Sequence, residues 1–293
     1  MPKTALVLSG GGAKGAFQVA AEQYAREAHG FKWDIIAGVS VGALNASLIA
    51  MGRQKRLREI WETMTKEQVH TGALNLWTVL KLLTGRRGIY DNAPLRELIA
   101  REIDPTRVPT DVVLRVGAVS LETGKYHTFS PADAEFADAV FASTSMPVIW
   151  PPVEVSARYP SMADGGLRNI SPLGDVLDFE PERVVIINCN SREPKPSRPL
   201  DNILDVARRA LLDIALNEIF VTDLREFLRI NQNVLEAGHH KVDLHNGKGR
   251  PYKYYEPVII EPEEDLDDTL DFSHAAIQRS LEAGYQRAKA VLD

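Results

Sequence analysis

The 293-residue sequence contains a single cysteine, Cys189, and no long hydrophobic run. One cysteine excludes an internal disulfide, and the first residues, MPKTALVLSGG, lack the charged start and long apolar stretch of a signal peptide. A helix needs roughly 20 apolar residues to cross a bilayer, and no segment approaches that length. These absences predict a reducing, cytoplasmic location and limit membrane contact to the periphery.

Neither a surplus of basic residues nor a low-complexity tract is present. Lys and Arg number 34 against 40 Asp and Glu, for a formal net charge of -6. Proteins that bind nucleic acid usually carry a basic face or tail, so this balance argues against such a partner. With 44% hydrophobic residues and no internal repeat, the chain can fill one large core or at most two domains. A small or lipidic substrate fits this composition better.

Short apolar runs alternate with helical patterns. The runs at 4–9 and 33–39 predict buried strands, and helical spacing follows each of them, at 16–30 and 41–52. Two strands joined at 122–125, another at 182–190, and helices at 94–103 and 133–143 complete the pattern. A chain that begins strand, helix, strand predicts an α/β fold with a mainly parallel central sheet.

The composition changes after Ser191, where REPKPSRP forms a proline-rich and charged connector. We expect a core at 4–190 and a mostly helical C-terminal extension at 201–293. The extension shows a helical region from about 202 to 237, one strand in YEPVIIEP, and a last helix over 273–292. One strand is too few for a sheet of its own, so the extension should pack on the core as part of a single globular unit.

The glycine loop SGGGAKG, residues 9–15, lies between the first strand and the first helix. Backbone amides at a helix N-terminus favour negative charge, whether of a phosphate or of an oxyanion. A P-loop requires Ser or Thr after Gly-Lys, but Lys14 is followed by Gly15 and Ala16. A dinucleotide site requires an acidic residue after the second strand, which ends in Val39 and Ser40. Both nucleotide interpretations therefore fit poorly.

The stretch GVSVG, Gly38 to Gly42, has a predicted strand before its serine and a predicted helix after it. This context is typical of a nucleophile on a sharp turn, where side chains at the two glycines would collide. Ser40 is therefore a candidate nucleophile, and amides of the first glycine loop could bind the oxyanion. A small-residue turn that packs helix on strand is the alternative.

Asp164 lies in SMADGGLRN, before Gly165 and Gly166, in what reads as a loop. An acid in such a loop could face Ser40 and take its proton. Most Asp-Gly pairs are ordinary turns, which is the alternative here.

Together these motifs resemble those of the patatin-like phospholipases. The glycine loop, the GVSVG turn, ASTSMP at 142–147 and Asp164-Gly165-Gly166 occur in that family's order. The resemblance implies a three-layer α/β/α fold and a Ser-Asp dyad, with Ser40 as nucleophile and Asp164 as its activating partner. It also implies an oxyanion hole at the first loop and no metal or organic cofactor. The oxyanion-hole residues would be Gly10, Gly11 and Gly12, supported by Lys14, Gly15, Gly38, Gly42, Gly165 and Gly166.

The function that follows is a serine lipid acyl hydrolase of phospholipase A, lysophospholipase or esterase type, acting through an acyl-enzyme. Family members often carry Arg where this chain has Lys14, which leaves the role of that position open. One alternative is a lipid- or anion-binding protein without catalysis. Another is a Ser-His-Asp esterase, whose histidine would be His239, His240, His245 or His274.

Two further segments raise their own possibilities. GHHKVDLH, residues 238–245, could hold a metal, but a charged surface loop is favoured because its ligands lack helical spacing. His127, within a strand, is assigned to packing or surface. The segment 74–88 is apolar and ends in two arginines, so it suits a lid or a patch that touches anionic lipid, with an ordinary core helix as the alternative.

Overall fold

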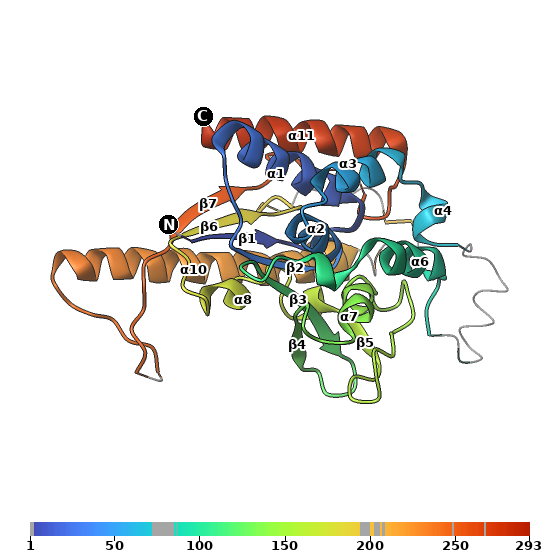
Figure 1. The fold of residues 1–293 in the computed structure, drawn as a ribbon, viewed down its shortest axis with the longest axis horizontal. Helices are drawn as coiled ribbons and strands as arrows, with labels where there is room; N and C mark the ends of the chain where they lie inside the picture. The colour runs from blue at the N-terminus through green and yellow to red at the C-terminus, as the bar shows by residue number, and fades with distance from the viewer. Residues whose placement is uncertain are drawn as a thin grey trace.

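In the computed structural model, a single twisted sheet runs through the middle of the molecule (Figure 1). The structure describes residues 3–71, 85, 87–193, 200–201, 206, 209–247, 249–266 and 268–293. The strands of the sheet are β1 (Thr4–Leu8), β2 (Ile35–Val39), β3 (Val113–Ser120), β4 (Tyr126–Phe129), β5 (Met162–Asp164), β6 (Arg183–Ile187) and β7 (Glu256–Ile260).

The sheet is mainly parallel, as the sequence predicted. Its order is β4-β3-β2-β1-β6-β7, and the pairs from β3 to β7 along this path are parallel. β4 is antiparallel to β3, and β5 pairs antiparallel with the far end of β3, beyond the residues that pair with β2. Because β1 and β2 are parallel neighbours, the turns that follow them lie at one edge of the sheet.

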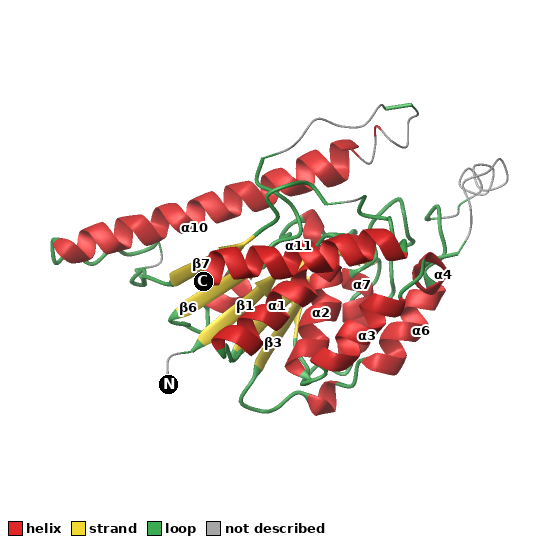
Figure 2. Ribbon diagram, turned by 90° about the horizontal axis from the view of Figure 1, so that it is seen from above, coloured by secondary structure: helices red, strands yellow, loops and turns green. Residues whose placement is uncertain are grey.

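Helices cover both faces of the sheet (Figures 1 and 2). On one face the core includes side chains from α1 (Gly15–His29), α2 (Val41–Ala50), α3 (Gln54–Thr63), α4 (Lys66–Val69), α6 (Ala93–Glu102), α7 (Phe136–Ser143) and α11 (His274–Leu292). On the other face it is formed with α8 (Gly174–Leu177) and α10 (Leu216–His239), which continues from a π-helical segment at Arg209–Ala215. Short 3-10 turns lie at Gly12–Lys14 (η1), Pro105–Arg107 (η2) and Gly165–Leu167 (η3).

Side chains of the central strands alternate between the two cores. In β1, Leu6 and Leu8 join the core under α1 and α2, whereas Ala5 and Val7 join the core under α8 and α10. Successive side chains of a strand point to opposite faces, and a strand covered on both faces is apolar throughout. The unbroken apolar run of β1 is thus explained by helices on both sides.

The C-terminal part of the chain contributes to the same sheet. β7 pairs with β6 in parallel, with Val258 opposite Val185, and α11 runs beside α1 in both views (Figures 1 and 2). The last strand and the last helix, expected in YEPVIIEP and over 273–292, are therefore present.

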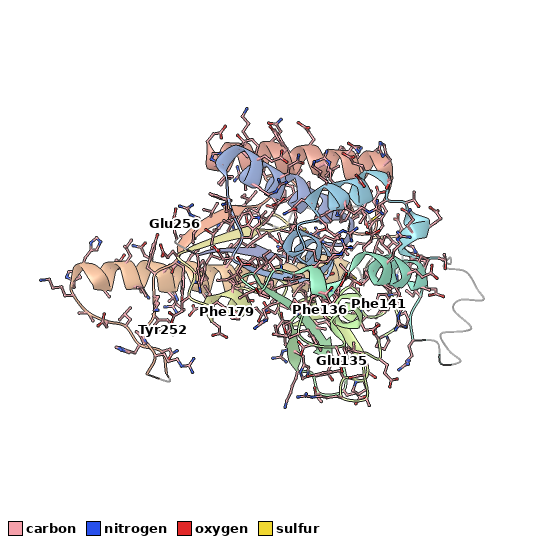
Figure 3. The ribbon with its side chains drawn as sticks, viewed as in Figure 1. Glu135, Phe136, Phe141, Phe179, Tyr252 and Glu256 are labelled. Carbon is pink, nitrogen blue, oxygen red and sulfur yellow. The ribbon has the colours of Figure 1, made fainter. Side chains whose placement is uncertain are left out.

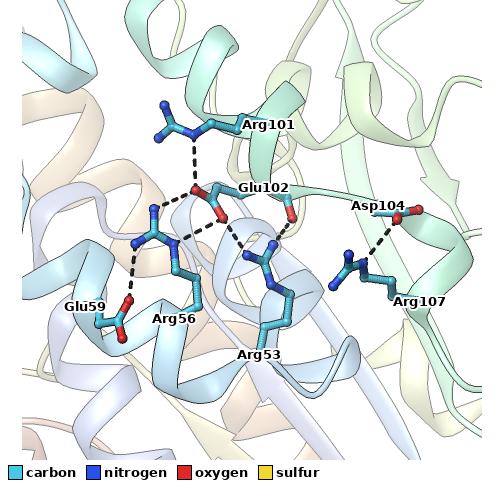
Figure 4. Close-up of polar contacts among 7 residues, drawn as sticks. All are labelled: Arg53, Arg56, Glu59, Arg101, Glu102, Asp104 and Arg107. Atoms are coloured by element: carbon cyan, nitrogen blue, oxygen red, sulfur yellow. Dashed lines mark hydrogen bonds and ion pairs between the residues drawn. The ribbon is translucent and has the colours of Figure 1, made fainter.

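An ion cluster joins α3 to α6 (Figure 4). The buried carboxylate of Glu102 accepts hydrogen bonds from Arg53 at 2.8 Å and from Arg56 at 2.7 Å, and Arg101 lies 3.2 Å away. These contacts, led by the bond from Arg56, lower the pKa of Glu102 to about 2. Glu102 is thus a fixed negative charge that holds the two helices together.

Candidate active site

Ser40 lies on the sharp turn between β2 and α2. Its φ of 57° is in the left-handed region, which L-residues rarely adopt, and α2 begins at the next residue. A Cβ on Gly42 would lie 2.3 Å from the Leu8 carbonyl oxygen, and one on Gly38 would lie 2.1 Å from the Gly42 carbonyl oxygen. The turn can therefore form only with glycine at both positions, and it leaves Ser40 at the carboxyl edge of the sheet.

Ser143 holds this turn from the side. The Ser40 amide donates to the Ser143 hydroxyl at 2.9 Å, and that hydroxyl donates to the Gly117 carbonyl of β3 at 2.6 Å. Ser143 is fully buried and ends α7, which Phe136 and Phe141 anchor in the core (Figure 3). The hydroxyl thus fixes the nucleophile turn to the strand beside it. From the sequence, ASTSMP was only a family motif, and no role for Ser143 was predicted.

Asp164 ends strand β5 instead of lying within a loop, which corrects the expected local structure. Its partner across the sheet is Ala118 of β3, and its amide donates to the Ser145 carbonyl at 2.9 Å. The three-residue strand is short and follows Pro160 and Ser161, so the sequence carried no strand periodicity. Pairing with β3 beyond the end of β2 places Asp164 next to the Ser40 turn.

The carboxylate of Asp164 lies beside Ser40, and it accepts a hydrogen bond at 2.8 Å from the Gly166 amide. Burial raises the pKa of Asp164 to about 6, and the Ser40 hydroxyl and the Gly166 amide oppose the rise only in part. Among the described residues, no cationic side chain acts on this carboxyl group. Its basicity is therefore greater than that of an ordinary aspartate.

The first glycine loop lies against Ser40. A Cβ on Gly10 would come within 3.2 Å of the Ser40 Cβ, while the Gly10 amide donates to the Ile170 carbonyl at 3.0 Å. Gly12 has a φ of 56°, and a Cβ there would lie 2.3 Å from the Thr269 carbonyl oxygen. In the described parts of the chain the amides of Gly11 and Gly12 have no acceptor. Two amides of the loop that contacts Ser40 therefore have no described acceptor, whereas the Gly10 amide is engaged.

The remaining motif residues support this loop. The Lys14 ammonium donates to the Asn190 side chain at 2.8 Å, which ties the loop to the end of β6. Gly15 begins α1 against Val41 and Trp61, while Gly165 and Gly166 form the turn after Asp164. Lys14 is itself buried and paired, so it acts within the protein as a tether of the loop.

A buried amide chain lies behind the glycine loop. The Gln18 side chain donates to the Ser9 carbonyl at 2.8 Å, and Asn45 donates to Gln18 at 2.9 Å. Trp61 in turn donates to Asn45 at 3.0 Å. Because all of these groups are buried and bonded, they fix α1, α2 and α3 relative to the loop.

The structure describes every histidine of the chain, and none of them is hydrogen-bonded to Ser40 or Asp164. His239, His240 and His245 lie between the end of α10 and the start of β7. Since β6 and β7 are parallel, that end of α10 lies at the amino edge of the sheet, opposite Ser40 (Figures 1 and 2). His274 begins α11, and His127 packs on Tyr159.

Two other expectations concern metal and membrane. Within the described ranges, no three His, Cys, Asp or Glu side chains gather as a metal site would require. No helix found in those ranges has the length and apolar character to cross a membrane. Most of the segment 74–88, for which the sequence suggested contact with lipid, lies outside the described residues.

Comparison with known proteins adds a family-level result. The model of the patatin-like phospholipases matches residues 6–177 of this chain. Uncharacterized NTE family proteins of Mycobacterium bovis and Mycobacterium tuberculosis are each 28% identical to it over 203 residues. These matches cover 67% of this chain and 52% of each relative, so the chain spans about half the length of the curated relatives it matches. VipD from Legionella pneumophila is similar in structure, with a TM-score of 0.46 and 14% identity, over 99% of this chain and 67% of VipD.

Proposed function

This chain belongs to the patatin-like phospholipase family, and from that premise we propose that it is a serine hydrolase that cleaves carboxylic esters of lipids through a Ser40–Asp164 dyad. The observation that carries the proposal is the buried Asp164 carboxylate beside the Ser40 hydroxyl, which lowers the raised pKa of that carboxylate. A nucleophile and a base within hydrogen-bond reach are the minimum that acyl transfer to a serine requires.

The first half of the proposed reaction forms an acyl-enzyme. The Ser40 oxygen attacks the ester carbonyl carbon while its proton passes to Asp164. The carbonyl oxygen becomes an oxyanion, which the amides of Gly11 and Gly12 would bind, since neither amide donates a hydrogen bond to another group of the described chain. Collapse of this intermediate breaks the ester C–O bond, and the departing alcohol takes the proton from Asp164.

The second half releases the acid. Asp164 removes a proton from a water molecule, which attacks the acyl carbon of the Ser40 ester. The returning proton regenerates the serine hydroxyl, so both half-reactions use the same carboxylate. An ordinary aspartate is a weak base for a hydroxyl, and burial of Asp164 reduces that mismatch because its pKa is about 6.

Covalent labelling tests this proposal. A fluorophosphonate should modify Ser40 in the folded protein, and peptide mapping should locate the adduct there. Ser40→Ala should abolish both labelling and ester hydrolysis. Ser47→Ala is the matched control, because Ser47 is equally buried in α2 and its hydroxyl only bonds the Ala43 carbonyl of its own helix. Folded wild-type protein that acquires no label at Ser40 would contradict the hydrolase proposal.

The dyad is tested separately from the nucleophile. Alanine at His127, His239, His240, His245 or His274 should leave most of the ester hydrolysis intact, because none of these rings reaches Ser40 or Asp164. One histidine variant as inactive as Ser40→Ala would replace the dyad with a triad. Folded protein that shows neither labelling of Ser40 nor ester turnover would favour the binding protein instead.

A further inference from the structure

Gly117 of β3 is packed against both turns of the proposed dyad. Its carbonyl oxygen accepts the Ser143 hydroxyl at 2.6 Å, and that hydroxyl accepts the Ser40 amide at 2.9 Å. On the other side, a Cβ on Gly165 would lie 2.4 Å from the same carbonyl oxygen, so the turn that follows Asp164 rests directly on it. A displacement of this one peptide group of β3 would therefore move the nucleophile turn and the base turn relative to each other.

The phenol of Tyr126, on the neighbouring strand β4, occupies the place of the side chain that Gly117 lacks. A Cβ on Gly117 would lie 1.8 Å from the Tyr126 hydroxyl oxygen and 2.2 Å from its Cζ, and the three nearest atoms all belong to this side chain. Tyr126 pairs with Val119, two residues along β3 from Gly117, so both positions face the same side of the sheet. The hydroxyl end of Tyr126 thus packs on the Gly117 backbone.

Asp175 holds this hydroxyl in place. The Tyr126 hydroxyl donates to the Asp175 carboxylate at 2.6 Å, and Asp175 lies in α8, on the face of the sheet opposite α7. Burial, followed by the negative charge of Asp175, raises the pKa of Tyr126 well above its usual value, so at neutral pH the phenol keeps the proton of this bond. Hydrogen bonds to a carboxylate are stronger than those between neutral groups. The phenol is therefore fixed where it meets Gly117.

The backbone of β3 does not itself require glycine at position 117. Gly117 is absent from the glycines with positive φ, and a glycine inside a strand weakens it because it packs no side chain. The residue is needed because the Tyr126 phenol fills the space above it. The strand thus loses a side chain at the point where it meets both turns, and it gains a contact with a hydroxyl that Asp175 anchors.

We propose that Tyr126 is a positioning residue: its phenol, held by Asp175, supports the Gly117 peptide and thereby the geometry of the proposed dyad. The inference rests on the proposed function because it assigns Tyr126 to the two residues of that reaction. Tyr126 acts through Gly117 and not on the substrate. Its removal should therefore lower kcat and leave KM nearly unchanged.

The hydroxyl is tested by Tyr126→Phe, which keeps the ring and removes the atom that meets Gly117 and Asp175. We expect kcat for p-nitrophenyl butyrate, per folded protein, to fall on the order of tenfold, with KM changed by less than about twofold. Tyr24→Phe is the matched control, because the Tyr24 hydroxyl also donates to an aspartate, Asp293, at 2.7 Å but at the C-terminal end of the chain. Equal losses of kcat in both variants, or a loss confined to KM, would overturn the positioning role.

The contact itself is tested by Gly117→Ala in two backgrounds. Alone, the added methyl group would collide with the Tyr126 hydroxyl, so kcat should fall by more than about tenfold. In a Tyr126→Ala background that space is empty, and the same substitution should lower kcat further by less than about twofold. Similar losses in both backgrounds would overturn the assignment, because the glycine would then be required for a reason other than Tyr126.

Hydrogen exchange separates this proposal from the hydrolase proposal, because it needs no turnover. Exchange of the Ser40 amide, which is bonded to Ser143, is followed by NMR relative to the amides of β1, which report global unfolding. Relative to them, Tyr126→Phe should exchange the Ser40 amide on the order of tenfold faster than wild type, and Tyr24→Phe should not. If wild type hydrolyses no ester but Tyr126→Phe still speeds this exchange, the hydrolase proposal fails and the positioning role stands. Unchanged exchange in Tyr126→Phe overturns the positioning role, whatever the activity.

Discussion

Asp164 and Glu102 are both buried carboxylates, with 4% and 3% of each residue exposed, yet their acidities are shifted in opposite directions. Burial raises the pKa of Asp164 to about 6, and among the described residues only the Ser40 hydroxyl and the Gly166 amide oppose this rise. Hydrogen bonds led by that of Arg56, with Arg53 and Arg101 beside it, lower the pKa of Glu102 to about 2 (Figure 4). Burial alone therefore does not decide what a carboxylate does in this protein.

The difference lies in the neighbouring cations. Around Glu102 three guanidinium groups replace the lost hydration, so the ionised form is the stable one and joins α3 to α6. Around Asp164 the described chain supplies no cation. The ionised carboxylate therefore destabilises the folded state relative to the protonated form, and it keeps a high affinity for a proton. One arrangement builds a structural anion, and the other has the properties that the proposed base requires.

Replacement of Asp164 by Asn should break this contrast most severely. Without a base we expect turnover to fall on the order of 10³-fold or more. The free energy of unfolding should instead increase at high pH. Because the pKa of Asp164 is raised, the contribution of its carboxyl group to stability is complete below pH 3.8 and is lost as the pH rises through about 6. A shift from 3.8 to about 6 corresponds to roughly 3 kcal/mol, so Asp164→Asn should be more stable than wild type at pH 8 by up to that amount.

Urea denaturation at pH 8 and at pH 5 measures this stability change. The gain from Asp164→Asn should be larger at pH 8 than at pH 5. Asp111→Asn is the control, since Asp111 is exposed and should show no such dependence. A variant that is less stable than wild type, and more so at pH 8, would contradict the assignment of Asp164 as a buried carboxylate without a cation.

Removal of the Ser143 hydroxyl tests whether activity requires Ser40 to be held in place beside Asp164. Ser143→Ala leaves the buried Ser40 amide without its acceptor, and we expect turnover and the rate of fluorophosphonate labelling to fall together by about 10- to 100-fold. Ser47→Ala is again the matched control. The pH at which activity is half-maximal should stay unchanged in Ser143→Ala, because Asp164 keeps its surroundings. Similar losses in both serine variants would show that Ser143 has no special role.

The pH dependence of turnover sharpens the comparison further. The base must be ionised, so kcat/KM should fall about tenfold per pH unit below pH 6 and level off above it. A titrating histidine would give a similar midpoint, so the profile is recorded for His274→Ala as well as for the wild type. Both profiles should coincide. A midpoint near 4, the range of an exposed aspartate, would show that Asp164 is not buried when the enzyme works.

Replacement of Glu102 by Gln should leave turnover within about twofold, the smallest of these effects on activity. It leaves two partly buried arginines and one exposed arginine without the buried carboxylate that they contact, so we expect a loss of roughly 3 kcal/mol in the free energy of unfolding at pH 7. The lowered pKa means that this contribution is present above pH 4.5 and is lost as the pH falls through about 2. The difference between wild type and variant should therefore shrink at pH 3. Glu97→Gln, exposed on the same helix α6, should change stability little at either pH.

Local patterns in the sequence determined the elements and the turn that carries Ser40, the candidate nucleophile. Apolar runs predicted the central strands, and GVSVG predicted the turn of Ser40, because strand burial and a tight turn each restrict residue type within a few positions. The sequence also carried Asp164 as a candidate through the family resemblance, but it suggested a loop where the chain forms β5. A three-residue strand has no periodicity of its own and exists only through its pairing with β3.

Only the tertiary structure decided how acidic each carboxyl group is and which groups reach Ser40. From the sequence alone, Asp164 and Glu102 cannot be told apart in acidity. Their pKa values differ because arginine side chains lie around Glu102, whereas no cation of the described residues acts on Asp164. The hydrogen bond from the Ser40 amide to Ser143 likewise joins residues about 100 positions apart, and the glycine loop meets Ser40 from about 30 positions away. Hydration, charge and hydrogen-bond geometry depend on which groups lie close together in space. They are therefore decided only when the chain has folded.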